Sequence, residues 1–201
     1  VNDRLYRVVR QAAKELGKRV SMDIVGAEAA TDRGVLEKMV APLEHLLRNA
    51  VSHGIEDPAE RQAAGKDEKG ELKLEIAHDG NEIVMTLSDD GAGLNLEKIR
   101  ARAVERKLIS EGEEISAQEL SDLIFMPGFS TATSISQISG RGVGMDIVLS
   151  ELQQMGGDIR IESQVGKGTT FRIRIPTNVT VNGALLVTAG ESSYAIPLGG
   201  L

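Results

Sequence analysis

The chain contains no cysteine and no tryptophan, and aromatic side chains make up only 2% of its 201 residues. The lack of cysteine excludes disulfide bonds and thiolate zinc sites, and it fits a reducing compartment. With so few aromatic rings there is no platform on which nucleic-acid bases could stack. The hydrophobic core must therefore be built from Leu, Ile, Val, Met and Ala.

Positive charge and long apolar runs are also scarce. The chain has 30 acidic against 23 basic residues and a net charge of −7, whereas a nucleic-acid-binding protein presents a basic patch. No apolar run approaches the roughly 18 residues of a membrane-spanning helix, and no signal peptide is apparent. We therefore expect a cytoplasmic protein with no nucleic-acid partner and no membrane insertion. The start at Val1 suggests a fragment of a longer chain.

The remaining composition, 41% hydrophobic and 26% charged, is typical of a globular domain. Apolar periodicity predicts helices near residues 5–16, 36–50, 95–107, 116–124 and 145–155. Alternation predicts strands near residues 20–24, 72–76, 83–87, 159–161 and 171–175, with hairpin turns at Gly80-Asn81 and Gly166–Gly168.

Several residues mark boundaries. Gly17 should stop the first helix. For the second helix, Thr31 is a candidate N-cap, Pro42 should kink or restart the helix, and Gly54 should end it. Residues 55–70 are predicted to form a loop with one short helix. Pro176 indicates a boundary between a domain over 1–177 and the truncated start of another over 178–201.

The segment Gly140-Arg141-Gly142-Val143-Gly144 has glycine at every second position, directly before a helical pattern that starts at Met145. Such a segment allows backbone amides to approach phosphate closely at a helix N-terminus. It matches neither the dinucleotide fingerprint nor the P-loop, and a flexible linker is the alternative interpretation. Residues 126–144 have few apolar anchors, which is typical of a functional lid or of a disordered segment.

Asp89 follows a predicted strand and is followed by Gly91 and Gly93. A buried carboxylate here could accept a hydrogen bond from an adenine amine, while the glycines let the ligand lie against the backbone. The alternative is a tight strand-to-helix turn in which Asn95 caps the next helix.

His45, Asn49 and His53 are spaced four residues apart, which places them on one stripe of a helix. They could be solvated polar residues on an outer face. Alternatively, the imidazoles could serve as metal ligands or as acid–base groups.

These signals together resemble the ATP-binding boxes of the GHKL superfamily, which includes histidine kinases and gyrase B. His45 and Asn49 resemble the N box, Asp89-x-Gly91-x-Gly93 the G1 box, and Gly140-x-Gly142-x-Gly144 the G2 box. Phe125 and Phe129 resemble the F box, and Gly168-Thr169 the closing block. The phrases PLEHLLRNAVSHGIEDPAER, DDGAGL, IFMPGFSTA and SGRGVGMDIV resemble CheA-type chemotaxis kinases over residues 5–177.

Two departures favour the hybrid kinases of pilus motility: Ser52 replaces a frequent Asp, and the linker TNVTVNGALLV is polar. Residues 178–201 look like the start of a CheW-like regulatory domain. The resemblance implies a two-layer α/β sandwich of mixed β-sheet and helices, the Bergerat fold of the GHKL superfamily. It implies a monomeric fragment of a homodimeric protein.

The resemblance further implies that ATP and Mg2+ bind here and that the γ-phosphoryl group passes to a His of a separate phosphoacceptor domain in two-component signalling. A CheW-like adaptor and a response regulator would be partners. His45 would orient or deprotonate the acceptor, Asn49 would hold the metal, and Asp89 would read adenine. The implied nucleotide-binding set comprises Asn49, Arg48, His53, Asp89, Gly91, Gly93, Lys98, Gly140, Arg141, Gly142, Val143, Gly144, Met145, Thr169 and Thr170, and the lid set comprises Phe125, Phe129, Ser130 and Thr131.

Two alternatives stay open at this point. One is a GHKL ATPase that hydrolyses ATP to drive a conformational clamp, although His45 stands where those enzymes have a glutamate base. The other is a nucleotide-responsive scaffold that is inactive as a kinase.

Overall fold

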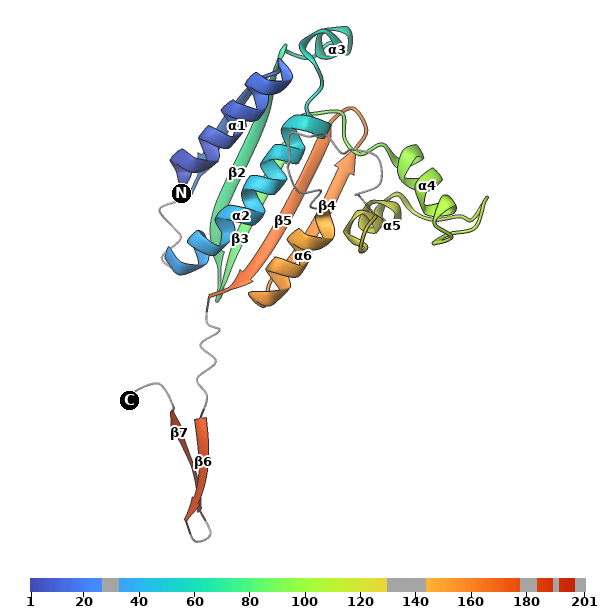
Figure 1. Ribbon diagram of the computed structural model, residues 1–201. Coiled ribbons are helices and arrows are strands. Elements are labelled where there is room, and N and C mark those ends of the chain that lie inside the picture. Colours follow the sequence, from blue (N-terminus) through green and yellow to red (C-terminus); the bar gives the residue numbers. More distant parts are fainter. Residues whose placement is uncertain (27–32, 130–143, 178–183, 190–191, 198–201) are drawn as a thin grey trace.

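A five-stranded mixed sheet forms the centre of the computed structural model, which describes residues 1–26, 33–129, 144–177, 184–189 and 192–197. The strands lie in the order β1-β2-β3-β5-β4, with β1 parallel to β2 and the other pairs antiparallel (Figure 1). Their bounds are β1 Arg19–Val25, β2 Lys69–Asp79, β3 Glu82–Asp89, β4 Asp158–Gln164 and β5 Gly168–Pro176.

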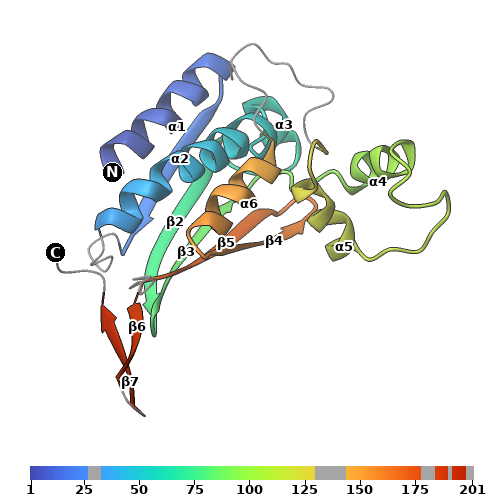
Figure 2. The same ribbon diagram turned by 60° about the horizontal axis from the view of Figure 1, so that its bottom comes forward.

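Three long helices cover one face of this sheet. They are α1 (Asn2–Leu16), α2 (Arg33–Asn49) and α6 (Met145–Gln154), which lie side by side over the strands (Figures 1 and 2). Along β2, buried and exposed residues alternate, because only one face of the sheet is covered. The expected two-layer α/β sandwich is confirmed.

The core between the two layers is aliphatic, as the composition predicts. Side chains with no exposed area come from α2, α6 and four strands: Met39, Leu43, Leu46, Leu47, Leu74, Ile83, Met85, Leu152, Ile161 and Ile173. Among aromatic residues, Phe171 joins this core. The apolar positions of the helices therefore form one side of this core, and the apolar positions of the strands form the other.

Most of the predicted helix ends and turns are confirmed. Gly17 ends α1 in the left-handed conformation, with φ of 65°. Gly80 and Asn81 form the β2–β3 turn, and Asn95 caps α4 (Leu96–Glu105) by accepting from the amide of Lys98 at 3.0 Å. Helix α5 (Ala117–Asp122) begins with a capping box of Ser116 and Glu119.

A second, smaller cluster joins α4 and α5 beside the edge of the sheet. Ala103, Ile109, Leu120 and Phe129 are its buried members. Gln118 of α5 donates from Nε2 to the carbonyl of Ile161 at 2.8 Å, which places α5 against β4. This position follows from the exposed carbonyls of an edge strand, which need hydrogen-bond donors.

Two predictions about α2 need comment. The helix runs continuously from Arg33 to Asn49, so the expected restart at Pro42 is wrong, while a kink there stays a prediction. Pro42 removes one backbone donor, but the buried residues Met39, Leu43 and Leu46 on either side hold the helix against the sheet. The candidate N-cap Thr31 lies outside the described residues.

Beyond β5 the chain forms β6 (Ala184–Ala189) and β7 (Ser192–Pro197), which pair antiparallel in a separate two-stranded sheet. The division at residue 177 stays a prediction. Within the described residues, no helix is both long and apolar enough to cross a membrane.

Candidate functional site

The loop that follows β3 is enclosed by two other parts of the chain. The amide of Ala92 donates to the carbonyl of Gly54 at 2.9 Å, and the amide of Gly166 donates to the carbonyl of Ala92 at 2.8 Å. Gly54 stands at the end of the α2 segment, and Gly166 lies in the β4–β5 turn. Three segments distant in sequence therefore meet at Asp89, the last residue of β3.

The Asp89 carboxylate is held by backbone amides. Its Oδ1 accepts hydrogen bonds from the amides of Gly91 at 2.9 Å and Thr169 at 3.3 Å. A Cβ on Gly91 would overlap the carbonyl oxygen of Gly54, and a Cβ on Gly54 would lie 3.2 Å from Asp89 Oδ2. Glycine at position 91 is thus required by close approach of the backbone, whereas a Cβ at position 54 would press against the Asp89 carboxylate.

Burial raises the pKa of Asp89 to about 6, against the opposing effect of the amides of Gly91 and Thr169. The neighbouring carboxylates of Asp90 and Glu56 raise the pKa further. Desolvation and like charge both disfavour the ionised carboxylate, so this group is a strong acceptor held at a free-energy cost. Such a perturbed group at an enclosed loop is typical of a functional site.

Asp89→Asn should raise the free energy of unfolding by about 3 kcal/mol at pH 7.5. Because the folded pKa lies above the unfolded value, the carboxyl stabilises the fold at low pH, and this contribution is lost as the pH rises through about 6. The amide oxygen of the substituted side chain would still accept from Gly91 and Thr169. Urea unfolding from pH 5 to 8 measures the difference, which should shrink to about half at pH 5. A matched control is the exposed Asp23→Asn, and a gain independent of pH would contradict the prediction.

The end of α2 lies against the beginning of α6. Asn49 is half-buried, and its Nδ2 lies 3.4 Å from the sulfur of Met145, the first residue of α6. His45, one turn earlier, is also half-buried, with its Nε2 inaccessible to solvent. The N-cap of α6 is Gly144, so Asn49 stands beside a helix N-terminus that can attract an anion.

The α-helical stripe expected for His45, Asn49 and His53 ends at Asn49. Residues Ala50–Gly54 form a π-helical turn, closed by the amide of Ile55 on the carbonyl of Ala50 at 2.7 Å. This turn leaves His53 exposed, whereas Asn49 is half-buried. π-Helical turns are rare and are frequent at functional sites.

Lys18 holds this turn in place, a role that sequence reasoning missed. Its Nζ donates to the carbonyls of Val51, Ser52 and Ile55 at 2.9, 3.0 and 2.7 Å. These are carbonyls that the end of a helix leaves without intrahelical donors. A basic residue 33 or more positions away in sequence gives no local signal of such a contact.

The comparisons with known proteins agree with this geometry. The family described as Histidine kinase-, DNA gyrase B-, and HSP90-like ATPase matches residues 39–179. The chain belongs to this ATPase family. The match includes α2 from Met39 onward, the Asp89 loop, the start of α6 and the β4–β5 turn.

Within the family, the chain is similar to chemotaxis kinases. It is 43% identical over 200 residues to the chemotaxis protein CheA of Bacillus subtilis, an alignment that covers 98% of this chain and 30% of that protein. It is 43% identical to the sensor histidine kinase CheAY of Helicobacter pylori, again over 98% of this chain but 25% of the relative. The chain thus spans under a third of the length of these relatives. A histidine kinase domain of Erythrobacter litoralis aligns with 86% of this chain and 63% of its own at 15% identity, with a TM-score of 0.49.

The family boxes are brought together in part. Thr169 is buried and Thr170 half-buried on β5, next to Asp89. Phe129 is buried under the guanidinium of Arg106, 5.7 Å from its ring centroid, and Phe125 is half-buried. Arg48 is half-buried on α2, and Lys98 is exposed on α4. Six predicted residues lie outside the described part of the chain: Ser130, Thr131, Gly140, Arg141, Gly142 and Val143.

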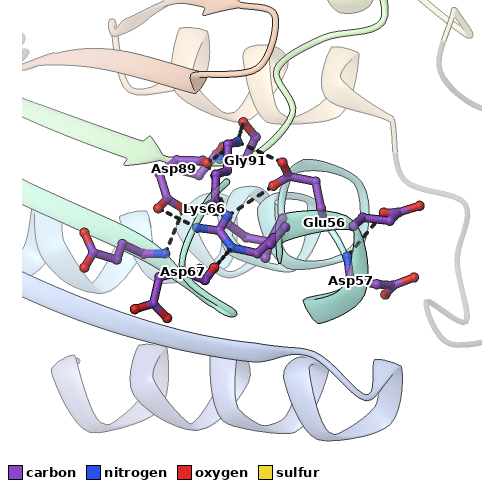
Figure 3. Close-up of polar contacts among 12 residues, drawn as sticks. Glu56, Asp57, Lys66, Asp67, Asp89 and Gly91 are labelled. Atoms are coloured by element: carbon purple, nitrogen blue, oxygen red, sulfur yellow. Dashed lines mark hydrogen bonds and ion pairs between the residues drawn. The ribbon is translucent and has the colours of Figure 1, made fainter. Parts of the chain in front are cut away.

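A buried polar network behind the Asp89 loop was also missed (Figure 3). It includes Glu56, Arg61, Lys66 and Asp90. Residues 55–70 contain helix α3 (Pro58–Ala63), which begins with a capping box and a proline in its first turn. The short helix predicted within this loop is therefore confirmed, but no local pattern gives the partners of its side chains.

The described residues contain no group of three or more His, Cys, Asp or Glu side chains that could hold a metal ion. Asn49 could serve as a ligand of Mg2+, because its side chain has an amide oxygen and the residue stands at the α6 N-terminus.

Proposed function

We propose that this chain is the ATP-binding catalytic domain of a CheA-like sensor histidine kinase. The observation that supports the proposal most strongly is the Asp89 carboxylate, fixed by two backbone amides in a loop where glycine is required. An ionised carboxylate in this position accepts a hydrogen bond from the amine of adenine, which a guanine base lacks at that site. Identity of 43% to the CheA protein of Bacillus subtilis supports the kinase assignment.

The residues divide the chemistry between two ends of the site. Asp89 binds the base, while the N-terminus of α6 and the glycines of residues 140–144 bind the phosphates. When bound, Mg2+ neutralises phosphate charge. Asn49 orients that metal through its amide oxygen, and His45 orients or deprotonates the incoming imidazole of the phosphoacceptor domain.

The full protein would act in two-component chemotaxis or motility signalling. We propose as partners a phosphoacceptor His domain, a CheW-like adaptor and a response regulator, with the following domain beginning near residue 178. A cytoplasmic location and a homodimeric full-length protein are part of the same proposal. The choice between flagellar and pilus pathways stays a prediction.

Incubation with a purified phosphoacceptor domain and γ-labelled ATP tests this function. Label on the acceptor His supports the kinase. Free phosphate without labelled acceptor would instead indicate an ATPase, and nucleotide binding without either product would indicate a scaffold.

Asp89→Asn should weaken ATP binding about ten- to a hundredfold. The substitution replaces a charge-assisted acceptor by an amide that can present its NH2 group to the adenine amine. Calorimetry at pH 7.5 measures the loss, with Asp23→Asn as the control. Because the ionised carboxylate is the stronger acceptor, the affinity of the unsubstituted protein should also fall as the pH drops below the pKa of Asp89, about 6. Unchanged affinity in folded Asp89→Asn would remove Asp89 from the site.

A further inference from the structure

Two basic side chains bind the peptide group between Asp90 and Gly91. Lys66 Nζ donates to the carbonyl of Asp90 at 2.9 Å and to the carbonyl of Gly91 at 2.8 Å. Arg61 Nη1 donates to the same Asp90 carbonyl at 3.3 Å. Figure 3 shows Lys66 between Glu56 and the loop that carries Asp89 and Gly91.

Arg61 is locked by a complete set of acceptors. Only 1% of its side chain is exposed. Its guanidinium bonds both oxygens of Asp90, at 3.1 and 2.8 Å, and Glu56 at 3.1 Å. Its remaining donors reach the carbonyls of Asp67 at 2.6 Å and Lys69 at 3.4 Å. The planar guanidinium group of Arg61, with this many partners, is held in one orientation.

Lys66 is fixed by Glu56, whose Oε2 accepts from Nζ at 2.8 Å. Burial by itself would raise the pKa of Glu56, but the hydrogen bond from Lys66 and the charges of Lys66 and Arg61 bring it below its ordinary value. Glu56 is therefore ionised at neutral pH. The network is electrostatically balanced, with Lys66 and Arg61 opposite Glu56 and Asp90.

The peptide group between Asp90 and Gly91 is consequently held at both ends. Lys66 and Arg61 bind its carbonyl oxygen, and its N–H donates to Asp89 Oδ1 at 2.9 Å. Because a peptide group is planar, fixing the carbonyl direction also fixes the N–H direction. That N–H in turn sets the rotation of the Asp89 carboxylate.

We propose that Lys66, supported by Arg61 and Glu56, is a positioning residue that sets the selectivity of this site for adenine nucleotides. It acts through the Asp90–Gly91 peptide group on the Asp89 carboxylate and makes no contact with the ligand. The inference rests on the proposed function, since it requires that Asp89 reads the base.

Lys66→Met tests the inference in the 201-residue chain. The substitution keeps the apolar stem and removes the ammonium group. We expect ATP affinity to fall about tenfold and the weak affinity for GTP to stay unchanged, so the ATP-to-GTP affinity ratio falls about tenfold. Calorimetry with each Mg-nucleotide at pH 7.5 gives both constants. Lys73→Met is the matched control, because Lys73 is half-exposed on β2 and paired with Glu75.

Lys73→Met also removes one positive charge, so the comparison separates positioning from charge. A ratio in Lys66→Met equal to that in Lys73→Met would overturn the inference. So would a parallel fall in ATP and GTP affinity. If the unsubstituted protein bound neither nucleotide, the proposed function itself would fail.

Discussion

Replacing His45 with glutamine is expected to lower phosphoryl transfer about 10²- to 10⁴-fold and to leave ATP affinity within about twofold. His45 lies on α2 one turn before Asn49, whereas Asp89 bonds the amides of Gly91 and Thr169. A group that acts on the acceptor imidazole contributes in the transition state and not to nucleotide binding. Initial rates of label transfer at saturating Mg-ATP measure the first effect, and calorimetry measures the second.

The control for His45 is His78→Gln, since His78 is exposed near the end of β2. That variant should transfer phosphate at the rate of the unsubstituted protein. A normal rate in His45→Gln would show that His45 is a structural polar residue of α2. A fall in ATP affinity as large as the fall in rate would place it in nucleotide binding.

Replacing Arg61 with methionine is expected to lower the free energy of unfolding by about 3 kcal/mol. The variant leaves Glu56 without one of its two cations and removes the donors to the carbonyls of Asp67 and Lys69. Because the Asp90 side chain is 41% exposed, water compensates part of the loss, and the effect belongs at the lower end of the range for buried ion pairs. Urea unfolding measures it.

Arg19→Met is the matched control for Arg61. Arg19 also pairs with a carboxylate, Glu68, at 3.0 Å, but its side chain is 70% exposed. An exposed pair contributes about 0–1 kcal/mol, so this variant should remain close to the unsubstituted protein. Equal losses in the two variants would show that the network around Arg61 does not stabilise the fold.

The elements of the fold could be predicted from the sequence because their signals are local. The spacing of Leu43 and Leu47 on α2, and of Ile83, Met85 and Leu87 on β3, reports directly which side of each element is buried. Pro42 shows the limit of such signals, since packing on both sides of it outweighs the lost hydrogen bond. The predicted hairpin turns account for the β2–β3 and β4–β5 pairs. The β1–β2 and β3–β5 pairs have no local signal, because they join strands far apart in the chain.

The part of the candidate site that lies within a short sequence motif could be predicted from that motif. Asp89 and Gly91 stand two residues apart and contact each other directly. Arg61 and Asp90 are 29 residues apart, and in the sequence Arg61 is one charge among many in a polar segment. A charged residue in such a segment is ordinarily solvated, so its burial depends on tertiary contacts that no spacing reveals.

The close packing of Gly54 against Gly91 has a consequence for drug resistance. Around Asp89 the wall of the site is made of backbone, where an added Cβ would meet the Gly54 carbonyl or the Asp89 carboxylate. An inhibitor that contacts only backbone atoms of this wall touches no side chain that a mutation could replace. A point mutation that enlarged either glycine would add a Cβ against the Asp89 carboxylate, which binds the base in the proposed function. Escape would have to arise elsewhere, at residues that contact the inhibitor but not the nucleotide.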